Sequence, residues 1–143
     1  MRVLRTYLRT PPMPGGMEKH IKNLTIHQNE DYSCNVCFNT GNKITDYDIK
    51  ILPNINLSWL KPNFLGVISF YLMTCVYFLF RQKDQYDVLH IHGDWSSLLV
   101  ASWLRKLISA KAVVFSIHDQ LINDFQRKML VRQLHKVDLI FTS

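Results

Sequence analysis

Residues 2–28 are RVLRTYLRTPPMPGGMEKHIKNLTIHQ, an apolar stretch, a turn rich in proline and glycine, and a helix-like stretch. The pattern predicts a strand over Arg2–Leu8 and a helix over Met17–Gln28. Gly15 and Gly16 let the backbone between them approach a ligand closely, and the helix that follows directs free N–H groups and its positive dipole end to the same place. This arrangement is typical of phosphate binding. A tight turn without a ligand is the alternative.

The alternation of strand-like and helix-like stretches continues along the chain. Strands are predicted at residues 32–38, 48–52, 87–92, 112–118 and 137–141, and helices at 64–83, 95–108 and 123–135, with a loop over 53–62. Strands that alternate with helices form βαβ units. The predicted fold class is therefore α/β, with a doubly wound parallel sheet.

Composition narrows the classes of partner. The 143 residues suffice for one domain over 1–143, and 48% of them are hydrophobic, which excludes a disordered chain. Seventeen Lys and Arg against eleven Asp and Glu leave a net charge of +6, which favours an anionic partner such as a nucleotide phosphate or a membrane surface. The charges are spread along the chain and no basic-aromatic motif accompanies them, so no nucleic-acid partner is expected.

The three cysteines are predicted to be buried structural thiols. Cys34 and Cys37 form a C-x-x-C, but no second cysteine or histidine pair completes a zinc site. On a strand, a separation of three places the two side chains on opposite faces. The N-terminal stretch has no signal-peptide core, so we expect a reducing cytoplasmic location.

Two segments are candidates for membrane contact. Residues 64–80 (FLGVISFYLMTCVYFLF) carry no charge and lie at the lower limit of length for a membrane span. Three interpretations remain: a transmembrane helix, a plain buried helix, and, favoured narrowly, a helix packed on the sheet whose exposed apolar face lies on a membrane. The predicted helix 123–135 offers a solvated basic face or a contact with an anionic bilayer through Arg127, Lys128, Arg132 and Lys136.

Polar residues follow three of the predicted strands. In an open parallel sheet, ligands bind beyond the carboxyl ends of the strands, near the switch in strand order. Gly15 and Gly16 follow the first strand, His90-Ile91-His92-Gly93-Asp94 ends the strand that begins at Asp87, and His118-Asp119 ends the strand that begins at Ala112. His118 follows a fully apolar strand, so we expect it to be fixed in the cleft and to donate a hydrogen bond to a sugar hydroxyl or a phosphate.

The same histidines allow other interpretations. His90 and His92 lie on one face of their strand, and with Asp94, His118 and Asp119 they form a candidate metal set, as in hydrolases built on H-x-H. His90 could equally be a satisfied core histidine. Asp119 could orient His118 or cap the following turn.

In their order, these motifs resemble the N-terminal domain of a glycosyltransferase family 4 enzyme of the retaining GT-B class. The resemblance depends on PPMPGGMEKHIKNL, on YDVLHIHGDWSSLLVA, and on KAVVFSIHDQL followed by VDLIFTS. It implies a Rossmann-like sheet that forms one half of a GT-B fold. It also implies donor-phosphate binding at Gly15 and Gly16, a catalytic His118, and an acceptor side lined by His92, Asp94 and Asp119. The weakest match covers residues 30–80, and the second Rossmann-like domain, which holds the nucleotide in such enzymes, has no counterpart in the sequence.

The resemblance sets the functional expectation. We expect the acceptor-side half of a retaining transferase, inactive alone, that moves a hexosyl unit from a UDP- or GDP-linked sugar to a cell-surface polysaccharide or lipid-linked glycan. We expect no cofactor and no metal, a location in the cytoplasm or on the cytoplasmic face of the membrane, and a second chain as the source of the donor domain unless the gene continues. The alternatives are a non-catalytic binding or membrane-scaffold module, a decayed gene fragment, and a metal-dependent hydrolase.

Overall fold

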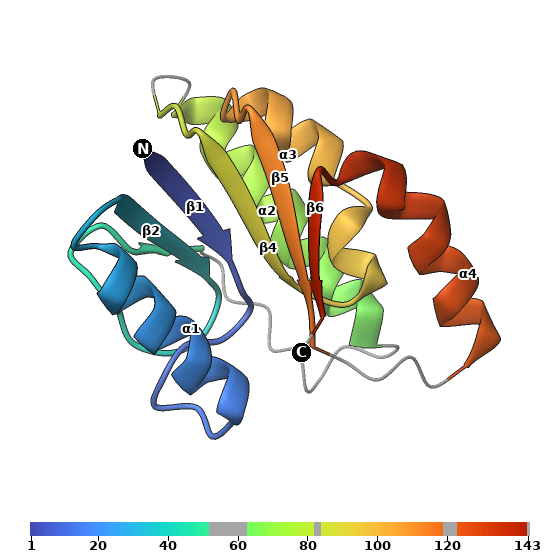
Figure 1. The fold of residues 1–143 in the computed structure, drawn as a ribbon, viewed down its shortest axis with the longest axis horizontal. Helices are drawn as coiled ribbons and strands as arrows, with labels where there is room; N and C mark the ends of the chain where they lie inside the picture. Colours follow the sequence, from blue (N-terminus) through green and yellow to red (C-terminus); the bar gives the residue numbers. More distant parts are fainter. Residues whose placement is uncertain (52–62, 82–83, 119–122, 143) are drawn as a thin grey trace.

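The computed structural model describes residues 1–51, 63–81, 84–118 and 123–142, and these form a parallel sheet with helices packed on it (Figure 1). The strand order is β3-β2-β1-β4-β5-β6, and every adjacent pair is parallel. The elements, in chain order, are β1 (Arg2–Thr6), α1 (Gly16–Gln28), β2 (Ser33–Phe38), β3 (Ile49–Lys50), α2 (Asn63–Phe80), β4 (Val88–Gly93), η1 (Trp95–Leu98), α3 (Ala101–Leu107), β5 (Ala112–Ile117), α4 (Asp124–Gln133), η2 (Leu134–Lys136) and β6 (Leu139–Thr142). The predicted fold class is confirmed.

The predicted helix over 95–108 is divided in the structure. It consists of a 3-10 turn, η1, and a separate α-helix, α3. Asp94 caps η1, since its Oδ1 accepts hydrogen bonds from the Ser96 amide at 2.9 Å and the Ser96 hydroxyl at 2.5 Å. Serine side chains that bond locally favour caps and turns over helix interiors, so the regular α-helix begins only after them.

The two faces of the sheet carry different helices. Arg5 on β1 donates to the Thr25 hydroxyl of α1 at 3.0 Å, whereas its neighbour Thr6 bonds Tyr71 of α2 at 2.9 Å. Because successive strand residues point to opposite faces, α1 and α2 cover opposite sides of the sheet. Figure 1 shows α1 beside β1 and β2, with α2 and α3 behind β4 and β5.

Helix α2 packs on the sheet through one face only. Phe70, Tyr71, Cys75 and Phe78 are buried in the core, and the other face leaves large apolar side chains exposed: Leu65, Leu72, Val76, Leu79 and Phe80. Among the described helices, none has the length and apolar character that crossing a membrane requires. The geometry is therefore that of a packed helix with an exposed apolar face.

Strand β6 forms an uncovered edge of the sheet. All four of its residues are exposed, with Leu139 at 50% and Phe141 at 53%. Both lie on the α1 side of the sheet, since they pair in register with Val114 and Ser116, and in Figure 1 no described helix lies in front of β4–β6.

The three cysteines are free and buried, as predicted. Cys34 lies on the face of β2 that packs near Arg5, and Cys37 lies on the opposite face, where its thiol bonds Thr74 of α2. Burial raises the pKa of Cys37, and it raises the pKa of Cys75 to about 11. A thiol is reactive as its thiolate, so these raised values make both cysteines inert packing residues.

Candidate functional site

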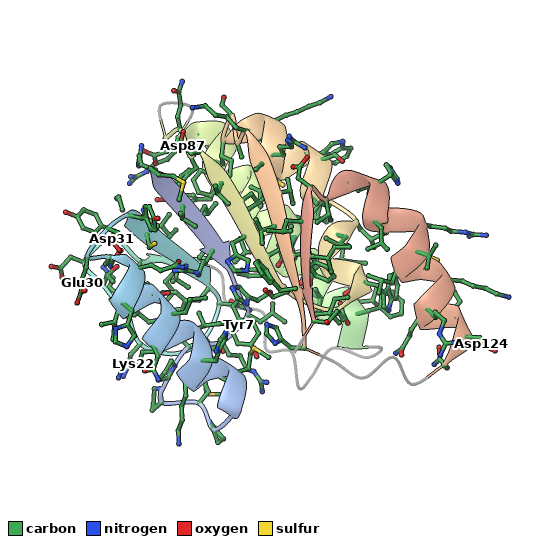
Figure 2. All side chains as sticks on the ribbon, in the orientation of Figure 1. Tyr7, Lys22, Glu30, Asp31, Asp87 and Asp124 are labelled. Carbon is green, nitrogen blue, oxygen red and sulfur yellow. The ribbon has the colours of Figure 1, made fainter. Side chains whose placement is uncertain are left out.

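A cleft of about 1080 Å³ opens at the carboxyl ends of β1, β4 and β5. The strand order reverses between β1 and β4, so the connection that follows β1 and the connection that follows β4 leave the sheet on opposite faces. This edge is the lower end of the sheet in Figure 1; in Figure 2, Tyr7, which lines the cleft, is labelled at that end and Asp87 at the opposite end. The predicted position of the site, at the switch in strand order, is where the cleft lies.

The glycine turn forms one wall of this cleft. Gly15 is the N-terminal cap of α1 and Gly16 is its first helical residue. At Gly15, with φ +159°, a Cβ would stand 1.9 Å from Oε2 of Glu18, whereas a Cβ at Gly16 would meet no atom within 4 Å. The backbone conformation at Gly15 is one that residues with a side chain rarely adopt, and Gly16 leaves open space in the cleft beside the N-terminus of the helix.

An ion pair lies directly behind the turn. Glu18, in the first turn of α1, is almost fully buried, and its Oε1 lies 3.1 Å from Nε of the half-exposed Arg9. A buried carboxylate at this place repels a phosphate, and the adjacent guanidinium offsets that repulsion. Arg9 and Glu18 line the cleft, although sequence reasoning did not select them.

Two histidines meet across the strands that form the floor of the cleft. Nδ1 of His92, on β4, lies 3.1 Å from Nε2 of His118, which follows β5, and the two rings are nearly parallel with centroids 5.4 Å apart. His20 of α1 lies nearby, with its ring centroid 6.0 Å from that of His118. Gly16 and His20 are four residues apart on one helix, so helical spacing from the glycine turn would have indicated His20 as a member of this group.

The histidines on β4 are held neutral. His90 is 9% exposed and its Nε2 bonds the Ser116 hydroxyl at 2.8 Å, which makes it a satisfied core histidine. Burial, with a smaller contribution from nearby Arg5, lowers the pKa of His90 to about 3. Burial, followed by His90 and His118, lowers the pKa of His92 well below its ordinary value. Uncharged imidazoles bind and orient through hydrogen bonds rather than through charge.

The structure places five of the six predicted site residues around the one cleft: Gly15, Gly16, His92, Asp94 and His118. Asp94 caps η1 with one of its oxygens, so part of its hydrogen-bonding capacity is structural. Asp119 lies outside the described residues. The roles assigned to these residues stay predictions.

The alternative of a metal site gains no support from the geometry. Within residues 1–51, 63–81, 84–118 and 123–142, no three His, Cys, Asp or Glu side chains are grouped so that they could hold a metal ion. His90 turns its Nε2 to Ser116, and His92 turns its Nδ1 to His118. These nitrogens bond protein groups rather than converge on a common centre.

Aromatic residues complete the far wall of the cleft. Trp95 of η1 packs edge-on against Phe125 of α4 with centroids 5.8 Å apart, and Phe64 of α2 lies 5.7 Å from the same indole. Sequence reasoning missed this group because the three side chains come from three elements. The cleft therefore combines a polar, glycine-lined side with an apolar, aromatic side.

Comparison with known proteins gives a family and a fold. The family model described as Glycosyltransferase Family 4 matches residues 14–142. A crystal structure of a protein from Listeria monocytogenes, provisionally described as a UDP-N-acetylglucosamine 2-epimerase, matches at 12% sequence identity with a TM-score of 0.50. The match covers 99% of this chain and 38% of that one, so the chain spans well under half the length of this structural relative. Comparison with curated proteins gives no match.

Proposed function

Because the chain belongs to glycosyltransferase family 4, we propose that it is the acceptor-side domain of a retaining transferase. The reaction moves a hexosyl unit from a nucleotide-sugar, UDP- or GDP-linked, to a cell-surface polysaccharide or lipid-linked glycan. The observation that carries the proposal is the shared cleft. It brings the open space at Gly16, beside a helix N-terminus, together with His118 at the switch in strand order.

Each side of the cleft has its own part in the proposed reaction. The backbone N–H groups at Gly15 and Gly16 receive the donor diphosphate, and the helix dipole of α1 stabilises its charge. His118 donates a hydrogen bond to a sugar hydroxyl or phosphate, and His92 and Asp94 line the acceptor side with the aromatic group of Trp95 and Phe125. The donor phosphate itself takes the acceptor proton, so the protein contributes positioning and electrostatics.

The nucleotide requires a second Rossmann-like domain, supplied by the same gene or by a second chain. The alternative is a non-catalytic binding or membrane-scaffold module that has the same sheet. Phosphate binding in the cleft distinguishes the transferase domain from the scaffold, because a scaffold does not need the glycine-lined wall that receives the phosphate. The location that we propose is the cytoplasm or the cytoplasmic face of a membrane.

The first test is the substitution Gly16→Val. Its Cβ projects into open space, so the fold is retained while the side chain fills the place where the phosphate approaches. We expect the amide signals of residues 15–18 of the ¹⁵N-labelled chain to move when inorganic pyrophosphate is added, and we expect Gly16→Val to weaken this binding at least tenfold.

The matched control is Lys22→Gln, which removes an exposed charge from α1 away from the cleft. It should leave pyrophosphate binding within a factor of two. Equal affinity of Gly16→Val and wild type, or signal changes confined to residues outside the turn, would contradict the phosphate site.

The second partner that we propose is an anionic membrane surface. Helix α2 exposes Leu72, Val76 and Leu79 to solvent, and α4 exposes Arg127, Lys128 and Arg132. An apolar face that enters the headgroup boundary, with basic side chains attracted to anionic lipids, is the usual composition of a peripheral contact.

Vesicle sedimentation tests this contact. We expect binding to vesicles that contain phosphatidylglycerol, little binding to pure phosphatidylcholine, and about a 30-fold loss for Arg127→Gln/Lys128→Gln, since each basic residue near such a surface contributes about 1 kcal/mol. Leu72→Ser/Leu79→Ser should weaken binding to anionic vesicles even at low salt. Lys22→Gln is again the control. If the α4 double variant bound as Lys22→Gln does, α4 would be excluded from the contact.

A further inference from the structure

The hydrogen bond between His92 and His118 joins two ring nitrogens, and one of the two carries the shared proton. His92 is 2% exposed and neutral, so it brings one N–H, and its Nδ1 lies 3.1 Å from Nε2 of His118. A hydrogen bond between two ring nitrogens needs a donor on one side and an acceptor on the other. Two arrangements satisfy this: His92 donates from Nδ1, or His118 donates from Nε2.

The second nitrogen of His92 decides between the two arrangements. Its Nε2 is buried and has no hydrogen-bond partner among the described residues. If His118 donated, the proton of His92 would reside on Nε2, as a buried N–H without an acceptor. If His92 donates from Nδ1, its Nε2 is a bare acceptor, and an unpaired acceptor is tolerated better than an unpaired donor in a protein interior.

The surroundings of His92 hold its ring in this orientation. The ring of His90 lies 4.0 Å from it, and His90 is itself fixed by its bond to Ser116. The other ionisable groups that act on His92 are the basic Arg5 on β1 and His20 on α1, and both lower its pKa and so disfavour an imidazolium.

We infer that His92 is a positioning residue: it donates Nδ1–H to Nε2 of His118 and thereby places the proton of His118 on Nδ1. With Nε2 occupied as an acceptor, a neutral His118 has its N–H on the opposite edge of the ring, in a fixed direction. The tautomer of His118 follows from the contacts alone, and only its role in catalysis rests on the proposed function. A catalytic hydrogen bond to a sugar or a phosphate needs a donor of fixed direction. The role of His92 thereby changes from acceptor binding to orientation of His118.

Histidine tautomers can be read directly from the ¹⁵N-labelled chain at pH 7 by long-range ¹H–¹⁵N correlation. In the wild type we expect Nδ1 of both His92 and His118 in the protonated range of ¹⁵N shifts and both Nε2 atoms in the unprotonated range. A wild-type spectrum in which His118 carries its proton on Nε2, or on both nitrogens, would overturn the inference.

Two substitutions separate orientation from packing. His92→Leu fills the space without a donor, so we expect the ¹⁵N shifts of His118 to move to the averaged values of exchanging tautomers. His92→Asn keeps an amide N–H close to the position of Nδ1, and we expect it to restore the wild-type pattern. His135→Gln, at an exposed histidine of η2 outside the cleft, is the control and should leave the His118 pattern unchanged.

The outcomes distinguish this inference from the proposed function. An unchanged His118 pattern in a folded His92→Leu variant would remove the positioning role, whatever the chain binds. If His92→Leu does not fold, the wild-type and His92→Asn spectra still decide the tautomer. Failure of the chain to bind pyrophosphate would remove the phosphate site and leave the tautomer result as it stands.

Discussion

Acidification from pH 7 to pH 4 is expected to unfold this chain cooperatively, because two buried histidines must stay neutral in the folded state. Burial lowers the pKa of His90 from 6.5 to about 3 and lowers the pKa of His92 well below its ordinary value. In the unfolded chain both take up a proton as the pH falls through 6.5. The unfolded state then binds more protons than the folded state, so the free energy of unfolding decreases as the pH decreases.

The expected size of the effect exceeds that of ordinary surface titrations. Each proton bound only by the unfolded state removes about 1.4 kcal/mol per pH unit, so two histidines remove about 2.7 kcal/mol per unit. The loss begins below pH 6.5 and, for His90, ends near pH 3, where the folded state also binds the proton. From pH 6.5 to pH 4 the loss is about 7 kcal/mol, which equals the whole stability of a domain in the lower part of the usual range of about 5–15 kcal/mol.

Urea unfolding measured by circular dichroism at half-unit steps from pH 7 to pH 4 checks this prediction. His90→Gln keeps a side-chain nitrogen for Ser116 but does not titrate, so its free energy of unfolding should fall about half as steeply with pH. His135→Gln, at an exposed histidine of η2, is the control and should reproduce the wild-type slope. A slope in His90→Gln equal to that of the wild type would show that His90 is protonated in the folded chain.

The largest functional effect is expected from His118→Ala. In a transferase assembled from this chain and a nucleotide-sugar-binding domain, the loss of a positioned hydrogen-bonding or proton-transfer group lowers turnover about 10²- to 10⁴-fold. His118 lines the cleft and its Nε2 lies 3.1 Å from His92, so the alanine removes a group whose orientation the fold has fixed. Steady-state transfer of a radiolabelled sugar measures the effect as a change in kcat.

Folding and activity are separated by two controls. The unfolding midpoint of His118→Ala should lie close to that of the wild type, and His135→Ala, at an exposed histidine outside the cleft, should retain full turnover. Transfer by His118→Ala at the wild-type rate would exclude His118 from the reaction, and the proposed catalytic role would then be wrong.

The sequence by itself determined the sheet and the sites on its edge. Apolar stretches that alternate with helical periodicity specify βαβ units, and handedness and short connections leave few ways to arrange them. Because the carboxyl ends of parallel strands share one edge, Gly16, His92 and His118 could be assigned to the same edge before any coordinates were known. The local sequence also specified the free, buried cysteines.

Only the tertiary structure decided which atoms meet. The Trp95–Phe125 wall and the His92–His118 contact each join elements that are far apart in the chain, and the Arg9–Glu18 pair joins two residues across the glycine turn. Periodicity reports the face on which a side chain lies, but its partner depends on strand register and on how the helices pack. The metal alternative illustrates this limit of sequence patterns. H-x-H spacing places His90 and His92 on one face of β4, but the register of β5 determines that His90 bonds Ser116 and that His92 bonds His118.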